Sequence, residues 1–397
     1  MSRADAPPLN RIKLVSALGI AQILAWSSTY YLPAVLATPI AQDTGWSITS
    51  VVIGLSWGLL IAGACSPLAG RQIDLLGGRS VLASSSLLLA LGMLMMGLAQ
   101  NLLTYYLAWT FIGAGMAAGL YDAAFSTLGR LLGDNARASI TGLTLIGGFA
   151  STLGWPLIAG MEHQIGWRYS CFVLASMHLA IGLPIYLLAI PRNQNMPLET
   201  PVQPIPVDTA ITSANNSPAR SASQLLLFLA VLLTLQSLVV STLSVHLLDV
   251  LKLLGIATAT ALAVGMMIGP SQVAARLAEF SIGRNLHPTW STRIAIVLCG
   301  LGIALLLPAV PWLAFVAMGL YGAGVGILTI ARGTLPLALF GAEGFGTRMG
   351  LLARPMLLAQ ATGPVAAALI LERFGSTPLL AVLCALVALS FVVSFAL

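Results

Sequence analysis

Long apolar runs separated by short polar connectors recur along the whole sequence, and they limit the possible folds more than any other feature. Each run is about 20 residues long, the length that an α-helix needs to cross the hydrocarbon core of a bilayer. We place twelve spans near residues 14–36, 47–69, 80–99, 102–128, 138–161, 167–190, 224–248, 255–278, 292–309, 312–337, 347–370 and 376–396. The pattern predicts an all-α membrane protein with twelve transmembrane helices.

The composition points to the same environment. Of the 397 residues, 58% are hydrophobic and only 8% are charged, which is too few charges to cover a soluble domain of this size. The formal net charge is +6, but the arginines are scattered over short connectors and do not form one basic patch. We therefore expect the lipid bilayer, and no nucleic acid, as a partner.

The distribution of basic residues predicts the orientation. With a cytoplasmic N-terminus, thirteen arginines and lysines fall in inside connectors, whereas only Arg168, Lys252 and Arg373 fall outside. Basic residues concentrate on the cytoplasmic side of membrane proteins. The first apolar run follows Arg11 and Lys13 and lacks the usual small-residue cleavage site, so we expect it to be retained. The chain is thus predicted to be a multi-pass inner-membrane protein with both termini in the cytoplasm.

A polar stretch divides the chain into two halves. Residues 191–223 carry six prolines among serine, threonine and asparagine. That composition cannot bury a core and is typical of an extended linker. We predict an N-terminal six-helix bundle at residues 1–190, a cytoplasmic linker at 191–223, and a C-terminal six-helix bundle at 224–397.

A charged pattern of arginine, acid, glycine and arginine occurs twice, in equivalent connectors. The first copy consists of Arg71, Asp74, Gly78 and Arg79, and the second of Arg276, Glu279, Gly283 and Arg284. All four positions are offset by 205 residues, and both copies follow a long apolar run. A duplication that produced two pseudo-symmetric bundles explains the match.

The first connector resembles the loop between helices 2 and 3 of the major facilitator superfamily. The matching positions are Gly70, Asp74, Gly77 and Arg79. The family usually has a basic residue where this chain has Leu75 and Gly78. The resemblance implies two bundles that rock about a midplane site, and a cytoplasmic gate in which Asp74 pairs with nearby arginines. Gly70 and the two four-residue copies are the expected gate, and a solvated loop that only sets topology is the alternative.

Three charged residues fall well inside predicted spans, namely Asp122, Arg332 and Arg354. Charges at membrane depth are costly and usually face a partner or a water-filled cavity. Gly113–Gly115 is echoed by Gly322–Gly324, and aligning the two places Asp122 at the level of position 331, beside Arg332. An acid in one half and a base in the other are therefore expected at nearly the same depth.

The resemblance also implies roles for these charges, because spans 1, 4, 7 and 10 line the central cavity of the family. Asp122 and Arg332 can then face each other across it. Arg332 can bind an anionic substrate as a planar donor fork, and Asp122 can take up a proton when its partner leaves. The alternative is a static ion pair, or a pair that reaches the cytoplasmic edge. Arg354 can be a second anion contact or can snorkel to the inner surface.

Five polar side chains in cavity-lining spans can hydrogen-bond a solute without titrating. They are Gln22, Tyr30, Tyr31, Tyr121 and Gln236. For each of them the alternative is a helix-to-helix hydrogen bond or a place in an interfacial aromatic belt.

Two further resemblances bear on the substrate and its coupling. The stretch from Tyr30–Tyr31 to Gly45–Ser47 is similar to bacterial relatives of the monocarboxylate porters, which fits Arg332 as a carboxylate ligand. Gly154–Pro156 resembles the helix 5 motif of antiporters in the superfamily, but Trp155 interrupts the usual Gly-Pro pair. We expect a secondary transporter that moves a small organic anion together with protons, by symport.

Other functions have weaker support. The alternatives are proton-driven efflux of a hydrophobic or cationic compound and, in another class, a membrane-embedded enzyme or a non-transporting sensor. The sequence contains no phosphate-binding Gly-Lys-Ser/Thr loop, no cluster of metal ligands and no nucleophile triad, and its linker is too short and too polar for a sensor domain. We therefore expect no enzyme activity, no cofactor and no metal, with a small-molecule substrate and protons as partners of a monomer.

Overall fold

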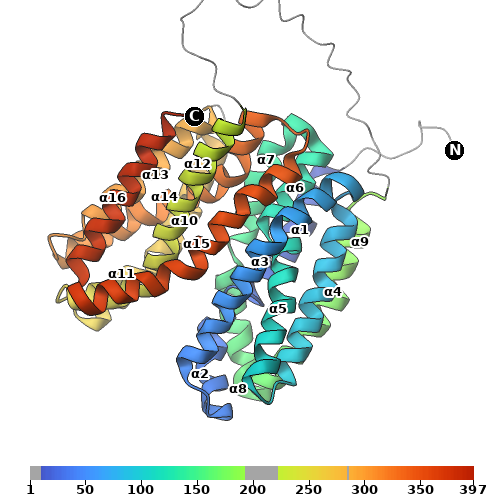
Figure 1. Cartoon of the computed structure of the whole chain (residues 1–397), viewed down its shortest axis with the longest axis horizontal. Coiled ribbons are helices and arrows are strands. Elements are labelled where there is room, and N and C mark those ends of the chain that lie inside the picture. The colour runs from blue at the N-terminus through green and yellow to red at the C-terminus, as the bar shows by residue number, and fades with distance from the viewer. Residues whose placement is uncertain (1–9, 193–221, 284–285) are drawn as a thin grey trace, which may run out of the picture.

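The computed structural model describes residues 10–192, 222–283 and 286–397, and every regular element in these ranges is a helix (Figure 1). Most of the predicted linker at 191–223, and Arg284 of the second charged pattern, lie outside the described residues.

The first half of the chain forms an N-terminal group of helices. Their bounds are α1 (Arg11–Ser27), α2 (Pro33–Thr44), α3 (Ile48–Leu76), α4 (Gly78–Gly97), α5 (Leu102–Gly119), α6 (Tyr121–Leu132), α7 (Ala136–Gly147), α8 (Ala150–Met177) and α9 (Leu183–Ala189). A short 3₁₀ helix, η2 (Gly133–Asn135), precedes α7, and a π-helix, η3 (His178–Gly182), joins α8 to α9. Gly166 interrupts α8 with φ 77° and ψ 165°, which glycine adopts without steric cost, and so divides it between two spans.

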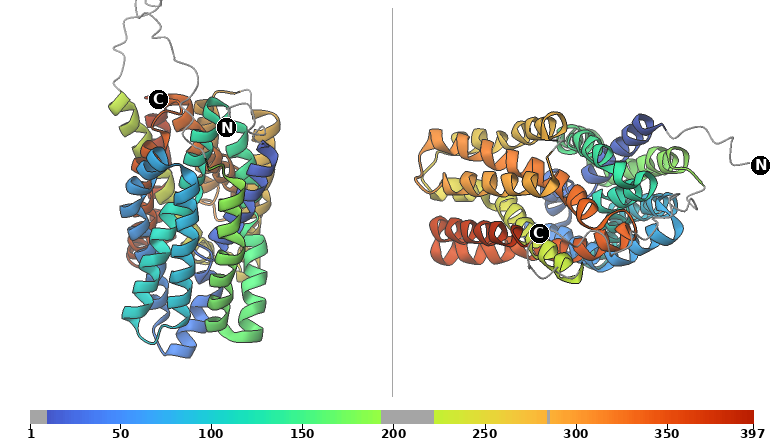
Figure 2. Two further views of the ribbon diagram at one scale, coloured as in Figure 1. Left: turned by 90° about the vertical axis from the view of Figure 1, so that its right-hand side faces the viewer. Right: turned by 90° about the horizontal axis from the view of Figure 1, so that it is seen from above.

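The second half forms a C-terminal group. Its helices are α10 (Ala222–Leu253), α11 (Thr258–Met266), α12 (Ile268–Ser281), α13 (Pro288–Ala304), α14 (Pro311–Phe340), α15 (Phe345–Phe374) and α16 (Ser376–Ser394). Seen from above, the blue-to-green and the yellow-to-red helices form two groups that lie side by side (Figure 2).

The described helices account for the twelve predicted spans. Nine helical stretches among the described residues are long and apolar enough to cross a membrane. One of them, Ala136–Ala189, is 54 residues long and is divided at Gly166 into two spans. The apolar α13 and the α1–α2 pair supply the remaining two. The prediction of an all-α protein with twelve membrane helices in two bundles is confirmed.

The two bundles meet at one end of the molecule and diverge toward the other (Figure 1). The helix pairs that join them include α3–α15, α6–α15, α7–α14, α7–α12 and α6–α14. Small residues allow the α3–α15 approach, since a Cβ on Gly70 would lie 2.0 Å from the carbonyl oxygen of Gly346, and one on Gly350 would lie 2.3 Å from that of Ser66. Glycine at a helix crossing lets two backbones pack closely within a membrane. We call this end of the molecule the closed end.

Candidate functional site

A break in the predicted span at residues 102–128 positions Asp122. Helix α5 ends at Gly119, Leu120 is extended with ψ −169°, and α6 begins at Tyr121. The buried Gln22 of α1 donates its Nε2 proton to the carbonyl oxygen of Gly119 at 2.7 Å, which satisfies an acceptor at the end of α5. Asp122 therefore lies in the first turn of α6, where the helix dipole favours a negative charge.

Arg332 of α14 meets Asp122 across the interface between the bundles. Its Nε donates to Asp122 Oδ1 at 2.7 Å, and its Nη2 donates to Oδ2 of the same carboxylate. The two side chains are only 14% and 15% exposed. This bidentate, charge-assisted contact is the strongest geometry available to an arginine and a carboxylate.

The free space beside the pair is small. It has a volume of about 20 Å³, enough for about one water molecule, and α1, α3, α5, α6, α14 and α15 all contribute to its lining. Its polar lining residues besides the pair are Trp26, Tyr30, Ser66, Tyr121 and Gln360. The site is therefore nearly filled by its own side chains in this conformation.

Aromatic rings of the N-terminal bundle cover one side of the pair. The ring centroid of Trp26 lies 5.0 Å from that of Tyr121, 5.5 Å from Tyr30 and 6.0 Å from Tyr31. Tyr121 stacks on Phe125 with an interplanar angle of 4°. Together these rings form a broad apolar wall with hydroxyl and indole groups at its edge.

A second arginine reaches the same region from the C-terminal bundle. Arg276 of α12 is only 5% exposed, and its guanidinium donates to the carbonyl oxygen of Thr144 in α7 at 3.2 Å and to Thr329 Oγ1 in α14 at 3.4 Å. Thr329 is three residues before Arg332 and so shares its helix face. Arg276 is also close enough to Tyr31 and Tyr121 to interact with them electrostatically.

Arg276 carries a charge that no described carboxylate neutralises. Among the described residues it has no carboxylate within ion-pair distance, and its Nε has no hydrogen-bond partner there. The repeated pattern predicts a place for it in the cytoplasmic gate, because its counterpart Arg71 falls in a connector. The structure instead turns Arg276 inward, whereas Arg71 is exposed on α3.

The two predicted glutamines, Gln22 and Gln236, form hydrogen bonds within their own bundles. Gln22 donates a hydrogen bond to Gly119, and its Oε1 accepts one from Trp26 Nε1 at 3.2 Å. Gln236 of α10 is 3% exposed and donates to Ser390 Oγ in α16. Both glutamines thus make the helix-to-helix hydrogen bonds that were the alternative, and a contact with substrate stays a prediction for them. Arg354 lies on an exposed face of α15.

At the closed end, Asp74 binds the N-terminus of α15. Its Oδ1 accepts the backbone N–H of Gly346 at 2.9 Å, and its Oδ2 accepts the backbone N–H and the hydroxyl of Thr347 at 2.6 and 2.7 Å. The residue at the N-cap of α15 is Gly344, which has no side chain to do this. Asp74 from one bundle therefore caps a helix of the other.

This geometry differs from the expected pairing of Asp74 with neighbouring arginines. Arg79 instead donates to the carbonyl oxygen of Leu187 at 2.6 Å, near the end of α9, and Arg71 is exposed at the surface. Arg130 donates to the main-chain oxygen of Asp74. The helix N-terminus offers the carboxylate three donors at once, which an exposed arginine side chain does not match without losing conformational entropy.

The second copy of the pattern also joins the bundles, by an ion pair. Arg137 at the start of α7 lies 3.5 Å from Glu279 Oε1 at the end of α12 and donates to the carbonyl oxygen of Gly283 at 3.2 Å. Glu279 Oε1 also accepts a hydrogen bond from the Ser291 hydroxyl at 2.8 Å. Gly78 has a packing role, since a Cβ there would lie 2.0 Å from Thr127 Oγ1.

Comparison with known proteins identifies the family. The sequence model of the Major Facilitator Superfamily matches residues 18–292, which is more than half of the chain. The chain belongs to this superfamily. No curated protein sequence matches it significantly.

Solved structures of major facilitator proteins share its fold. The human organic anion transporter MFSD10 (TETRAN) superposes with a TM-score of 0.72 at 17% identity, over 98% of this chain and 100% of that one. The proton:xylose symporter XylE, bound to 6-bromo-6-deoxy-D-glucose, superposes with a TM-score of 0.69 at 14% identity, over 97% of this chain and 95% of that one.

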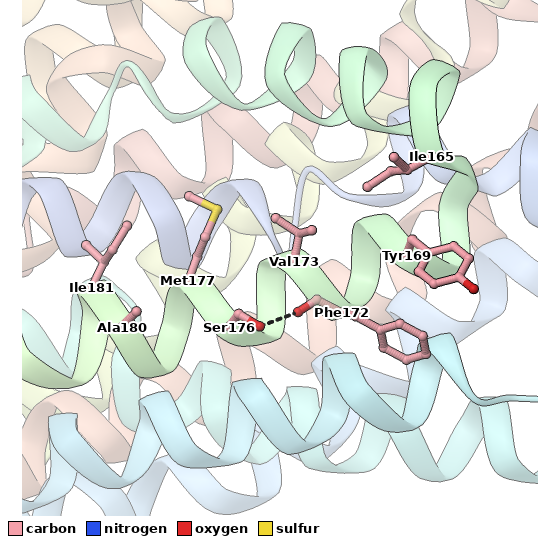
Figure 3. Close-up of a pocket in the computed structure, with 8 residues that line it drawn as sticks. All are labelled: Ile165, Tyr169, Phe172, Val173, Ser176, Met177, Ala180 and Ile181. Carbon is pink, nitrogen blue, oxygen red and sulfur yellow. Dashed lines mark hydrogen bonds between the residues drawn. The ribbon is translucent and has the colours of Figure 1, made fainter.

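This chain has a larger hollow elsewhere, along α8 and η3 of the N-terminal bundle (Figure 3). Its volume is about 610 Å³, and it is lined by Ile165, Tyr169, Phe172, Val173, Ser176, Met177, Ala180 and Ile181. All of these belong to α8 and η3, and none lines the space at the Asp122–Arg332 pair. It is a largely apolar surface of one span, as expected where lipid chains contact a bundle.

Trp26 and Thr347 are among the residues at these sites that the sequence analysis did not single out. Trp26 is four residues after Gln22 and four before Tyr30, so helical spacing alone places it on the same face. Thr347, which binds Asp74, has no comparable signal, because nothing in its local sequence says that another bundle will reach the start of α15.

Proposed function

We propose that this member of the Major Facilitator Superfamily is a secondary active transporter of the inner membrane that moves a small organic anion together with protons. The observation that carries the proposal is the charge at the bundle interface. Arg276 and Arg332 supply two positive charges there, and Asp122 supplies one negative charge. A cation that stays uncompensated in a poorly solvated region is costly, and a bound carboxylate would remove that cost.

The aromatic wall favours an organic anion over an inorganic one. The rings of Trp26, Tyr30, Tyr31 and Tyr121 lie on the N-terminal side of the site, opposite the arginines of the C-terminal bundle. An anion with a carboxylate and an apolar body can contact both sides at once. A cationic substrate has less support, because the site already has more positive than negative charge.

Asp122 is the proposed proton carrier. Its carboxylate holds Arg332 in the conformation described here. If the substrate takes over Arg332, Asp122 loses its partner, and a carboxyl group that is both unpaired and poorly solvated favours the protonated form. Substrate binding and proton uptake then become linked steps.

Alternating access would come from rocking of the two bundles. The closed end, with its Asp74 cap and its Arg137–Glu279 pair, is proposed to face the cytoplasm together with both termini, as the distribution of basic residues predicts. The description of MFSD10 as an organic anion transporter agrees with the proposed substrate class, and that of XylE as a proton symporter agrees with the proposed coupling.

Binding of labelled carboxylates to purified variants tests the substrate class. In proteoliposomes, the wild type should take up at least one member of a panel of small carboxylates when the lumen is made alkaline. Arg276→Gln and Arg332→Gln should each lower substrate affinity at least tenfold, since hydrogen bonds to charged groups contribute about 1.5–3 kcal/mol. Arg373→Gln, an exposed change near the far end of α15, is the matched control. Normal affinity in both site variants would rule out the arginines as anion ligands.

A further inference from the structure

The guanidinium group of Arg354 has no ion-pair or hydrogen-bond partner among the described residues. It is nine residues after the start of α15, about 14 Å along the helix axis from that end. Its side chain is exposed, and so are Leu351 and Leu358, which lie on the same face at spacings of three and four. That face is apolar and points away from the bundle core, so it contacts lipid in a membrane. An arginine at such a position needs an anionic or polar partner outside the protein.

A second exposed arginine lies on the same side of the α3–α15 crossing. The helices run antiparallel, since Gly63 faces the backbone of Arg354 and Gly70 faces Gly346. Arg71 is next to Gly70 and exposed, so the two arginines are about 12 Å apart along the crossing, with Arg71 nearer the closed end. α3 and α15 are neighbours where the two bundles meet (Figure 1).

Neither arginine is neutralised by a residue that the structure describes. Within the ranges that the structure describes, Arg71 and Arg354 make no hydrogen bond or ion pair through their guanidinium groups. The nearest acid in sequence to Arg71 is Asp74, and its carboxylate is already used by the N-terminus of α15. The two positive charges are therefore available to a ligand.

The surface between them is suited to an acyl chain. Leu68 of α3 is 60% exposed, one turn before Arg71, and Leu351 and Leu358 flank Arg354 on α15. Long arginine side chains at membrane depth turn toward the nearer interface, which brings Arg354 toward Arg71. The surface thus combines exposed leucines with two exposed arginines, one from each bundle.

We propose that Arg71 and Arg354 form a binding site for an anionic phospholipid of the leaflet at the closed end, with the phosphate between the guanidinium groups and an acyl chain along the exposed leucines. Because one arginine belongs to each bundle, the bound lipid bridges α3 and α15. It therefore binds the conformation in which this end is closed better than one in which the helices have parted, and it shifts the population toward the closed end. The proposal does not depend on which substrate the protein transports.

Native mass spectrometry of the full-length protein in detergent tests the site, with dioleoyl phosphatidylglycerol as the probe. Dioleoyl phosphatidylcholine serves as the zwitterionic comparison and glycerol 1-phosphate as the free anion. Basic residues near a membrane surface each strengthen binding of anionic lipid, so Arg71→Gln and Arg354→Gln should each weaken phosphatidylglycerol binding about fivefold. Arg71→Lys with Arg354→Lys should retain most of the binding, and Arg373→Gln, exposed at the other end of α15, should leave it unchanged.

Three results would overturn the proposal. The first is equal binding of phosphatidylglycerol and phosphatidylcholine by the wild type. The second is unchanged phosphatidylglycerol binding in the Arg71→Gln, Arg354→Gln double variant, or an equal loss in Arg373→Gln. The third is displacement of the lipid by millimolar glycerol 1-phosphate, which would make this a site for a soluble anion. The melting temperature of each variant in phosphatidylcholine alone shows whether it is folded.

Discussion

At the scale of single residues, Asp122 and Arg332 form a pair whose two possible roles have different physical requirements. The contact is bidentate and mostly buried. Removing one partner of a buried pair leaves an uncompensated charge that costs about 3–5 kcal/mol. A pair that exchanges partners avoids this cost because the acid can take up a proton, whereas a fixed pair needs only two opposite charges.

Asp122→Asn separates the two roles. Asparagine can accept a hydrogen bond from Arg332 but cannot carry a proton, so we expect substrate binding and counterflow to persist and accumulation driven by a pH gradient to be lost. Labelled uptake into proteoliposomes, with and without an imposed gradient, measures this. The control exchanges the charges, with Asp122→Arg and Arg332→Asp. Accumulation by Asp122→Asn against a gradient, or restored gradient-driven transport in the exchanged variant, would show that the carboxylate at this position carries no coupled proton.

The sequence predicts the depth of the Asp122–Arg332 pair, but it does not predict that a third charged residue, Arg276, lies near it. The echo of Gly113–Gly115 in Gly322–Gly324 is enough to place Asp122 at the level of Arg332. Arg276 cannot be placed in the same way. It occupies the position of Arg71 in the repeated pattern, yet one is exposed and the other buried, because spacing fixes where a residue lies along a helix and not which neighbours pack around it.

At the scale of elements, the start of α15 depends on a side chain from another bundle. Its first backbone N–H groups have no acceptor on their own cap residue, Gly344, and Asp74 of α3 supplies two. A capping side chain contributes about 0.5–2 kcal/mol, and a negative charge at a helix N-terminus adds to this. These contributions exist only while the closed end is closed, so they act on the conformational equilibrium and not on either bundle alone.

Asp74→Ala should therefore shift the equilibrium between the two ends. A loss of about 1–2 kcal/mol lowers the ratio of closed to open molecules about 5- to 30-fold. We expect slower transport with an unchanged melting temperature, and faster labelling of a cysteine at Ser66 by a thiol reagent added from the closed end. Glu343→Gln is the matched control, because Glu343 is an exposed acid near the same helix start whose side chain does not cap it. Equal labelling of both variants would remove the gating role of Asp74.

Apolar run length predicts the number of crossings, but not where a span breaks. Run 102–128 predicts one continuous helix, yet the chain interrupts it at Leu120. The interruption is held by Gln22, which is 97 residues earlier and bonds to the carbonyl oxygen of Gly119. A break stabilised by a distant side chain has no local signature, and this one aims Asp122 at the interface.

At the scale of the whole molecule, each copy of the repeated pattern supplies an acidic residue that links the two bundles, and both links lie at the closed end. Asp74 joins α3 to α15, and Glu279 joins α12 to α7. The four helices are related by the duplication, since Arg137 opens α7 as Arg348 opens α15. The two links differ in chemistry, a helix cap in one case and an ion pair in the other. Their common location means that the bundles can separate there only if both links break, which makes opening a single cooperative step.

A disulfide across α3 and α15 tests whether transport needs that separation. A Cβ on Gly63 would lie 3.5 Å from the Cβ of Leu357, within the range of about 3.5–4.5 Å that disulfides require. In a background with alanine at Cys65, Cys171, Cys299 and Cys384, Gly63→Cys with Leu357→Cys should crosslink on oxidation. We expect oxidation to abolish uptake and a reductant to restore the rate of the reduced double variant. Each single cysteine variant should be insensitive to the oxidant. A fully crosslinked protein that transports at the reduced rate would show that α3 and α15 stay together at this level through the cycle, and the rocking of two rigid bundles about this interface would be wrong.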